Sequence, residues 1–187
     1  MTDHSFALFE TAIGHCAIVW SERGIAGVQL PEADADATRR RVLCRFAGAR
    51  EAMPSADVQR AIDGVVALLA GEPRDLRDVV IDDDETPDFN RRVYAIARTI
   101  PPGQTMTYGE IAERLGDKLL ARAVGQALGE NPVPIIMPCH RVLAAGGKSG
   151  GFSASGGVVT KLRLLTIEGA QPGGPTLFEH LPLATRT

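Results

Sequence analysis

The chain has 187 residues, of which 44% are hydrophobic and 23% are charged, as in an ordinary globular protein. This length allows one compact unit or two small units joined closely. No apolar stretch is long enough to cross a membrane, and the first residues do not resemble a secretion signal, so we expect a cytoplasmic protein with no membrane partner. The 3 cysteines, Cys16, Cys44 and Cys139, are too few and too scattered for a disulfide framework, which leaves free thiols for chemistry.

The charges are distributed unevenly. The net charge of -3 argues weakly against a nucleic-acid partner. However, residues 1–85 contain 9 Lys and Arg against 16 Asp and Glu, whereas residues 86–170 contain 10 against 6. Only the basic second half is therefore predicted to face a polyanion.

The first half is predicted to form a small antiparallel sheet with helices. Glycine-containing turns separate segments with the pattern of strands, namely residues 6–10, 16–20 and 25–30. Residues 38–46 and a segment that begins at Ser55 have apolar residues at helical spacing. Residues 79–81 could add another strand.

An acidic run at residues 82–85 follows these elements. Blocks of like charge are usually solvated linkers, so we place a boundary here between domains of residues 1–85 and 86–170. Residues 171–187 are predicted to be a surface extension, anchored by Leu177 and Phe178.

A helix is predicted to open the second half. Thr86 would supply the N-cap hydroxyl, Pro87 the first helical position and Asp88 an acid near the positive end of the helix dipole. Its buried stripe is predicted to consist of Phe89, Val93, Ile96 and Ile100.

Two short helices joined by a tight turn suggest a helix-turn-helix. Thr107 and Glu110 have the spacing of a capping box, which starts the first helix. That helix turns Ile111, Ala112 and Leu115 inward and ends at Gly116. The second helix covers residues 120–128 and turns Val124 and Leu128 inward.

The second of these helices has an outer surface with little bulk. Arg122, Gln126 and Gly129 share the face opposite the core, and the small residues Ala121, Ala123, Gly125 and Ala127 leave little side-chain bulk around them. Small residues would let the backbone approach a DNA groove, with Arg122 projecting into it. Packing against another helix also demands small residues, and ordinary helical hairpins outnumber DNA-binding ones, so the hairpin alone does not decide.

Residues 131–142 contain the candidate chemical centre. Pro132, Pro134 and Pro138 forbid a regular helix and hold Cys139 in a defined extended or turned backbone. A thiol with a pKa of about 8.5 is a poor nucleophile at neutral pH unless a base or a positive charge activates it. His140 is adjacent in sequence, but catalytic pairs usually come from distant segments, so the dipeptide alone is weak support.

A glycine-rich polar loop over residues 146–157 precedes the helix that contains Lys161. It contains Gly-Lys-Ser, but a P-loop needs a glycine where this chain has Val142, so we reject nucleotide hydrolysis. The loop is better interpreted as a lid or a pocket wall.

These motifs together resemble the O6-alkylguanine-DNA alkyltransferases, also called methylated-DNA-protein-cysteine methyltransferases. Residues 138–142 match the family signature Pro-Cys-His-Arg-Val, and residues 122–125 and 131–135 match motifs that precede it. The resemblance covers residues 86–169 well. The first half resembles the family only in the order of its elements, chiefly at residues 11–14 and 23–25.

The resemblance implies an α/β (α+β) fold. A small ribonuclease H-like N-terminal domain would hold an antiparallel sheet and helices, and a mostly helical C-terminal domain would hold the helix-turn-helix. The implied activity is repair of O6-alkylguanine in double-stranded DNA by a monomer, with irreversible transfer of the alkyl group to Cys139. The product thioether has no route back to a thiolate, so each molecule would react once and would need no cofactor.

The resemblance also implies roles at the reacting centre. Cys139 would attack the alkyl carbon as a thiolate, His140 would act as its base through a water, and Glu168 would orient that histidine. Asn131 would brace the turn that carries the cysteine. Lys161 would favour the ionised forms of Cys139 and Tyr108 by its charge.

DNA contacts and the lesion pocket follow from the same resemblance. The helix-turn-helix would enter the minor groove, Arg122 would fill the space left by the extruded guanine, and Tyr108 would help to rotate the nucleotide and would protonate the leaving guanine. The other DNA-binding residues would be Ala121, Ala123, Gly125 and Gln126. The lesion pocket would be lined by Val142, Ser153, Ser155, Pro134 and Leu128, with the main chain of Cys139 and Val142 against the guanine edge.

Two departures from the family pattern affect these assignments. The usual pocket loop is Tyr-Ser-Gly-Gly or shorter, whereas residues 152–157 here are Phe-Ser-Ala-Ser-Gly-Gly, so the serine that bonds the alkylated oxygen is either Ser153 or Ser155. Some relatives carry a structural zinc, but Ser21 and Ala26 stand where ligands are expected. His4, His15, Cys16 and Cys44 also lack metal-site spacing, so we expect no metal.

Two alternatives remain at this stage. A binding-only relative of the same fold would recognise alkylguanine and recruit other repair factors, but such proteins lack the acceptor cysteine. A cysteine hydrolase that uses Cys139 and His140 would turn over repeatedly without DNA.

Overall fold

The first half of the chain forms a sheet whose strands place successive side chains on opposite faces. In the computed structural model, which describes residues 3–170, a meander of three antiparallel strands is extended by a short parallel fourth, in the order β3-β2-β1-β4. The strands are β1 (Ser5–Thr11), β2 (Gly14–Ser21), β3 (Gly24–Gln29) and β4 (Arg50–Glu51). The three predicted strands are confirmed: β1 and β2 are slightly longer than expected, and β3 begins and ends one residue earlier than expected. The predicted extension over residues 171–187 lies outside the described residues.

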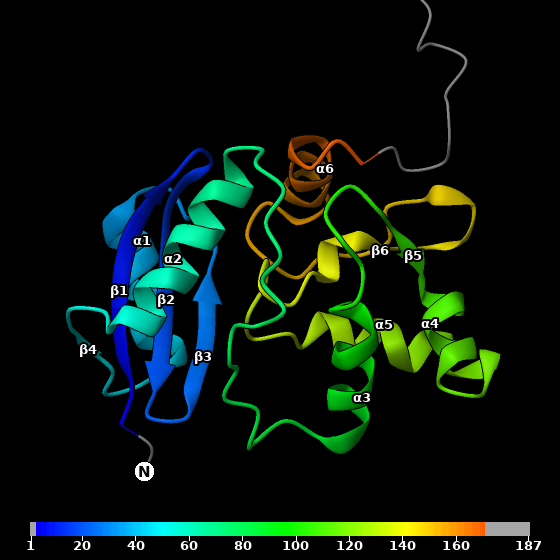
Figure 1. The fold of residues 1–187 in the computed structure, drawn as a ribbon, viewed down its shortest axis with the longest axis horizontal. Coiled ribbons are helices and arrows are strands. Elements are labelled where there is room, and N and C mark those ends of the chain that lie inside the picture. The colour runs from blue at the N-terminus through cyan, green and yellow to red at the C-terminus, as the bar shows by residue number, and fades with distance from the viewer. Residues whose placement is uncertain (1–2, 171–187) are drawn as a thin grey trace, which may run out of the picture.

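The central strand β2 is buried on both faces, because its residues alternate between two apolar layers. Ala17 and Val19 share one layer with Val42 of α1 (Ala35–Arg45). Cys16 and Ile18 belong to the other layer, which includes the apolar face of α2 (Ala56–Leu69). The two helices therefore cover opposite faces of the sheet (Figure 1).

Helix capping explains where these two helices begin. The side chain of Asp34 accepts a hydrogen bond from the N–H of Ala37, so α1 starts earlier than the apolar spacing predicted. Ser55 caps α2 through the N–H of Val58, so the helix begins one residue after the predicted start.

The second half is mainly helical, with one two-stranded sheet that joins β5 to β6 in parallel. Residues 3–170 contain six α-helices in total, of which four lie in this half. The elements are α3 (Asp88–Ala97), β5 (Met106–Thr107), α4 (Tyr108–Arg114), α5 (Ala121–Gly129), β6 (Val142–Leu143) and α6 (Gly157–Ile167). The predicted capping box is confirmed, because Thr107 and Glu110 exchange hydrogen bonds at the start of α4.

Three details of the sequence interpretation are corrected. The N-cap of α3 is Pro87, with no side-chain hydrogen bond, so Thr86 is not the cap. Residues 79–81 form no strand but a single bridge between Ile81 and Ile25. The acidic run is exposed at residues 83–85, but the carboxylate of Asp82 is buried and accepts a hydrogen bond of 2.5 Å from Ser21.

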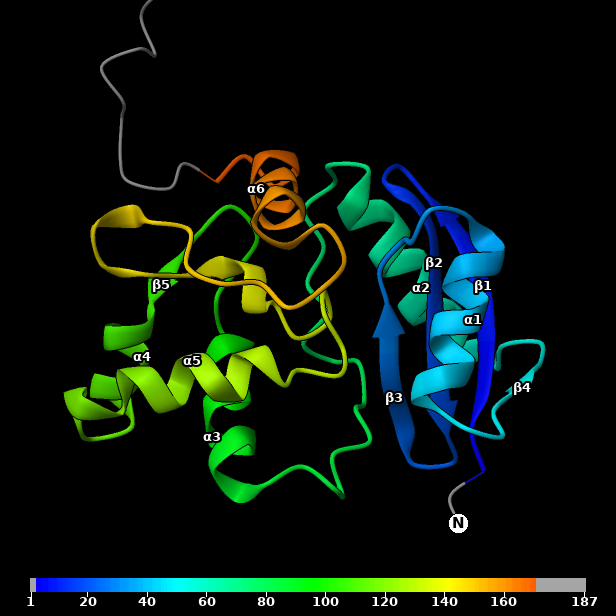
Figure 2. The same ribbon diagram turned by 180° about the vertical axis from the view of Figure 1, so that it is seen from behind.

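One apolar core extends from the sheet into the second half, where it includes residues of α3, α4, α5 and α6. The segment after α5 runs back to β3 (Figure 2), where the N–H of Val28 donates to the carbonyl of Pro132 at 2.9 Å. No helix in the described part of the chain is both long and apolar enough to cross a membrane. The sheet and the helical part thus share buried surface and backbone hydrogen bonds.

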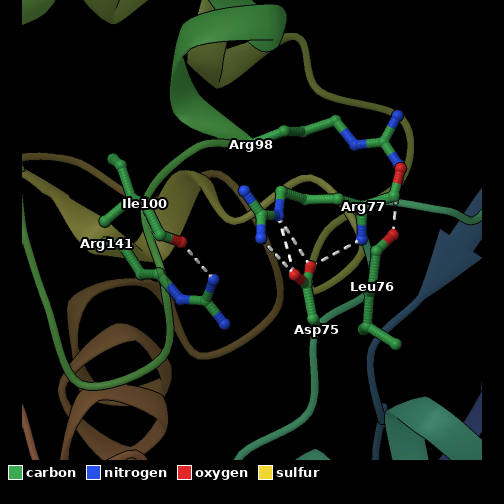
Figure 3. Close-up of polar contacts among 6 residues, drawn as sticks. All are labelled: Asp75, Leu76, Arg77, Arg98, Ile100 and Arg141. Carbon is green, nitrogen blue, oxygen red and sulfur yellow. Dashed lines mark hydrogen bonds and ion pairs between the residues drawn. The ribbon is translucent and has the colours of Figure 1, made fainter.

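Arg98, at the end of α3, fastens the segment that connects α2 to the second half. Its guanidinium donates to the carbonyls of Leu76, Arg77 and Val79 at 3.1, 2.8 and 2.8 Å. Figure 3 shows Arg98 reaching this segment beside the pair formed by Arg77 and Asp75. A single side chain therefore provides hydrogen-bond donors to the carbonyls of a segment that has no regular secondary structure.

We predict that Arg98→Ala lowers the free energy of unfolding by about 2 kcal/mol, because a charged donor is lost from several carbonyls at once. Urea unfolding followed by circular dichroism measures the change. Arg92→Ala, at an exposed position of the same helix, is the control and should change stability by less than about 0.5 kcal/mol. Equal stabilities of the two variants would contradict the role given to Arg98.

Candidate functional site

The thiol of Cys139 lies at the start of a one-turn 3-10 helix (Cys139–Arg141), and Cys139 lines a cavity of about 870 Å³. The turn is preceded by Ile135, the one non-glycine residue of the described chain with a left-handed backbone (φ 75°). A β-branched residue in this conformation is strained, and such strain is often held at functional sites. The proline frame predicted from the sequence is therefore a bent segment that holds the cysteine at its end.

Asn131 fixes the sulfur atom. Its Nδ2 donates to Sγ of Cys139 at 3.2 Å and to the carbonyl of Met137 at 2.9 Å. Its Oδ1 accepts from the N–H of Val133 at 2.9 Å, which determines the orientation of the amide. The bracing function that the resemblance implied for Asn131 thus has a defined geometry.

Burial makes the thiol hard to ionise. It raises the pKa of Cys139, and the hydrogen bond from Asn131 and the positive charge of Lys161 oppose this rise without cancelling it. Since the thiolate is the nucleophilic form, this cysteine needs a base that removes its proton.

The carboxylate of Glu168, the residue that caps the end of α6, organises the groups around the cysteine. It accepts from Nε2 of His140 at 2.9 Å and from Nε and Nη2 of Arg141 at 2.9 and 2.7 Å. The remaining guanidinium nitrogen of Arg141 donates to the carbonyl of Ile100 at 2.6 Å, as Figure 3 shows. Burial alone would raise the pKa of Glu168, but the hydrogen bonds from His140 and Arg141 outweigh it and lower the pKa to about 2.

These contacts determine the protonation of His140. Its imidazole is almost wholly buried, and burial lowers its pKa although Glu168 acts in the opposite direction. Because the carboxylate can only accept, the Nε2 atom carries the proton and Nδ1 keeps its lone pair. Nδ1 is buried and has no hydrogen-bond partner within residues 3–170, so it is the basic atom of the site.

Lys161 is fully buried beneath the glycine-rich loop. Its Nζ donates to the carbonyl of Val142 at 2.6 Å and to that of Gly151 at 3.4 Å. The same atom lies 5.7 Å from the centre of the Tyr108 ring. Burial lowers the pKa of Lys161 to about 8, while the nearby Cys139 thiolate raises it.

Tyr108 is the first residue of α4 and is half-buried. Burial, with a smaller contribution from the Cys139 thiolate, raises the pKa of its hydroxyl group. The glycine-rich loop crosses Tyr108 at Gly150, whose φ is 66° and where a Cβ atom would lie 2.7 Å from the Tyr108 hydroxyl. Only glycine allows this crossing.

The structure brings most of the predicted site residues together. Cys139, Asn131, Pro134, Ser153 and Ser155 line the same cavity, whereas Leu128 and Val142 are buried in the core. The residues proposed for DNA contact lie apart from the cavity lining. Arg122 and Gln126 are exposed on α5, with Ala121, Ala123 and Gly125 half-buried around them.

Both candidate serines of the loop are engaged elsewhere. The hydroxyl of Ser153 donates to the carbonyl of Gly129 at 2.7 Å, and that of Ser155 donates to the carboxylate of Glu32 at 3.0 Å. Either serine would therefore have to release its present acceptor before it could donate to an alkylated oxygen.

Sequence reasoning missed three contributors. Arg141 was identified only as part of the signature and was given no role, although it forms a buried ion pair with Glu168. Glu32 and Arg45 come from the first half and line the cavity of Cys139. No local motif identifies these two residues, because their position depends on how the two halves pack.

Comparisons with known proteins agree with this architecture. The family model described as the DNA binding domain of 6-O-methylguanine DNA methyltransferase matches residues 88–170. The methylated-DNA–protein-cysteine methyltransferase of Mycobacterium tuberculosis is 46% identical over 120 residues, which are 64% of this chain and 70% of the relative. That of Methanosarcina acetivorans is 32% identical over 165 residues, which are 88% of this chain and 98% of the relative.

Solved structures give the same result. The structure of M. tuberculosis OGT in complex with DNA superposes with a TM-score of 0.72 at 32% identity, over 88% of this chain and 92% of the other. That of M. tuberculosis O6-methylguanine methyltransferase has a TM-score of 0.70 at 31% identity, over 92% and 96% of the two chains. The protein therefore belongs to the methylated-DNA–protein-cysteine methyltransferase family.

The depressed pKa of Glu168 predicts an acid-sensitive site. The pKa falls from 4.5 to about 2 on folding, so the ionised carboxylate contributes about 3 kcal/mol of stability above pH 4.5, and this contribution is lost as the pH falls from about 4.5 to about 2. Urea unfolding at stepped pH values should show this loss in the natural protein. Glu168→Gln should lack it and should be less stable at pH 6, because Arg141 would be buried without its counter-charge.

Glu113→Gln is the matched control, since the ion pair that Glu113 forms with Lys118 is exposed to solvent. Its pH profile should follow that of the natural protein. If the pH profile of Glu168→Gln also followed that of the natural protein, the ionisation of Glu168 would not be coupled to folding and the prediction would be wrong.

Proposed function

We propose that this protein repairs O6-alkylguanine in duplex DNA by direct reversal, with Cys139 as the acceptor of the alkyl group. The observation that carries the proposal is a buried thiol, fixed by Asn131, that is followed in the chain by a neutral imidazole whose basic nitrogen is unpartnered among the described residues. Membership of the methyltransferase family supplies the substrate class.

The proton of the thiol leaves first. His140 accepts it at Nδ1 through a bridging water, and Glu168, held by Arg141, stabilises the resulting imidazolium. Lys161 stabilises the thiolate by its charge. The thiolate then attacks the alkyl carbon, so that the S–C bond forms as the C–O6 bond breaks and guanine leaves with the bonding electron pair. Tyr108 donates a proton to the leaving base.

The reaction is stoichiometric because the thioether cannot be converted back to a thiol by any group of the site. We expect a monomer that acts in the cytoplasm, where cysteines stay reduced.

We further propose that α4 and α5 form a helix-turn-helix that binds DNA in the minor groove, and that the first half is ribonuclease H-like. The resemblance in sequence and the exposed face of α5 with Arg122 and Gln126 support the first part. The target base must leave the duplex stack to reach a cavity that lies at the end of α5, where Gly129 lines it, and Arg122 occupies the gap that the base leaves.

Incubation with a duplex that contains O6-methylguanine should add the mass of one methylene to the tryptic peptide of Cys139, with one equivalent per protein. The peptides of Cys16 and Cys44 should stay unmodified, and Cys139→Ser should bind the duplex without any transfer. Binding without modification in the natural protein would instead indicate a lesion-recognition protein. Repeated turnover without DNA would indicate a cysteine hydrolase.

Extrusion by Arg122 predicts a substrate-dependent defect. Arg122→Ala should slow alkyl transfer from duplex DNA by at least about tenfold, equivalent to roughly 1.4 kcal/mol, but should change the reaction with free O6-benzylguanine less than twofold. Single-turnover kinetics on both substrates measures the split. Arg60→Ala, at an exposed arginine of α2, should change neither rate. Equal losses on both substrates would refute a role in extrusion.

A further inference from the structure

The loop that covers the cavity is held from two sides. Residues 152–155 line one wall of the cavity that contains Cys139. Ser153 bonds Gly129, at the end of α5, whereas Ser155 bonds Glu32, a residue that lies in the connection between β3 and α1. The second contact joins positions 123 residues apart and ties the loop to the first half of the chain.

Glu32 is itself fixed before it meets the loop. Its Oε1 accepts from Nε2 of Gln29 at 3.2 Å, which leaves Oε2 for Ser155 at 3.0 Å. Its backbone N–H donates to the hydroxyl of Thr38 at 3.1 Å, and Thr38 is completely buried. The carboxylate is therefore a preorganised acceptor rather than a mobile surface group.

The same chain of contacts continues to the other side of the cysteine. Oε1 of Gln29 accepts from Nη1 of Arg45 at 3.1 Å, and Nη2 of Arg45 donates to the carbonyl of Pro132 at 3.4 Å. Pro132 follows Asn131, which holds the sulfur atom. We call the residues Arg45, Gln29, Glu32 and Ser155 the brace, since they connect both walls of the cavity through the first half.

The composition of the loop explains why an anchor matters. Residues 146–157 contain 6 glycines, and glycine loses more conformational freedom than any other residue when it is ordered. A hydrogen bond to a carboxylate is stronger than one between neutral groups. Its anchor on Glu32 therefore selects one position of the wall relative to Cys139.

We propose that Glu32 is a positioning residue that holds the cavity wall through Ser155 and thereby limits the size of the alkyl group that reaches Cys139. The inference rests on the proposed alkyl transfer. When the anchor is lost, the wall moves outward, the cavity widens, and a benzyl group gains access relative to a methyl group.

The test is a double-mutant cycle with Glu32→Ala, Ser155→Ala and the double variant. Single-turnover rate constants are measured with duplexes that contain O6-methylguanine or O6-benzylguanine. Each single variant should raise the benzyl-to-methyl ratio of rate constants about fivefold, close to the roughly 1 kcal/mol of one hydrogen bond, and the double variant should raise it no further. Glu32→Gln, which retains an acceptor oxygen, should restore the ratio to within twofold of the natural protein.

Glu10→Ala removes an exposed carboxylate from β1 and should leave the ratio unchanged. A ratio that stays constant in Glu32→Ala or in Ser155→Ala would overturn the proposal. Additive effects in the double variant would overturn it too, because Ser155 would then act directly on the lesion. Should Glu32→Ala fail to fold in thermal melting, Ser155→Ala and Glu32→Gln decide between these outcomes.

The failure of this inference is distinguishable from that of the proposed function. A natural protein that transfers no alkyl group to Cys139 refutes both. Transfer with an unchanged ratio in the variants refutes only the role of Glu32.

Discussion

The buried carboxylate of Glu168 is the interaction on which the rest of the site depends. It is at the end of α6, yet it holds two consecutive residues of the segment that carries the cysteine, His140 and Arg141. An isolated buried charge is costly, and here the arginine compensates it while the histidine remains neutral. The ion pair thus fixes the orientation of the imidazole without giving it a charge, which is the state that a base requires.

The same arrangement explains why burial does not disable the thiol. A buried cysteine resists ionisation, as the raised pKa values of both Cys16 and Cys139 show. Among residues 3–170, the only polar side-chain partner of the Cys16 thiol is a threonine hydroxyl at 3.8 Å. Cys139 has an amide donor, a buried ammonium group and a neighbouring base. Position relative to these groups, rather than exposure, separates a structural cysteine from a reactive one.

Much of the fold could be predicted from the sequence because local signals were strong. The apolar run of β2 between glycine-containing turns indicates a strand, and the capping box at Thr107 indicates the start of a helix. Residues 79–81 were misjudged because β-branched residues also occur where a segment makes only one bridge, here to Ile25, while the carbonyl of Val79 accepts from Arg98 instead of from a strand. Thr86 has the chemistry of a cap, but the helix begins one position too late for its hydroxyl to reach the first free N–H groups.

The site was predictable to the extent that it is continuous in sequence. Residues 138–142 and Asn131 lie within a short span, so their motif could be identified. Glu32 and Arg45 reach the cavity only because β3 and α1 pack against the segment after α5. This packing is a long-range tertiary contact, and no local sequence motif predicts it. The partners of Ser153 and Ser155 depend on that packing too, so no sequence pattern could indicate them.

The hydrogen bond between Val28 and Pro132 has a consequence for the behaviour of the sheet. β3 is an edge strand, and an uncovered edge exposes free N–H and C=O groups to strands of other molecules. The segment that leads to the cysteine covers part of this edge, with Arg45 bonded to carbonyls on both sides of the junction. The backbone that carries the chemistry thus also shields the sheet from aggregation, so a change that loosens it would endanger solubility together with activity.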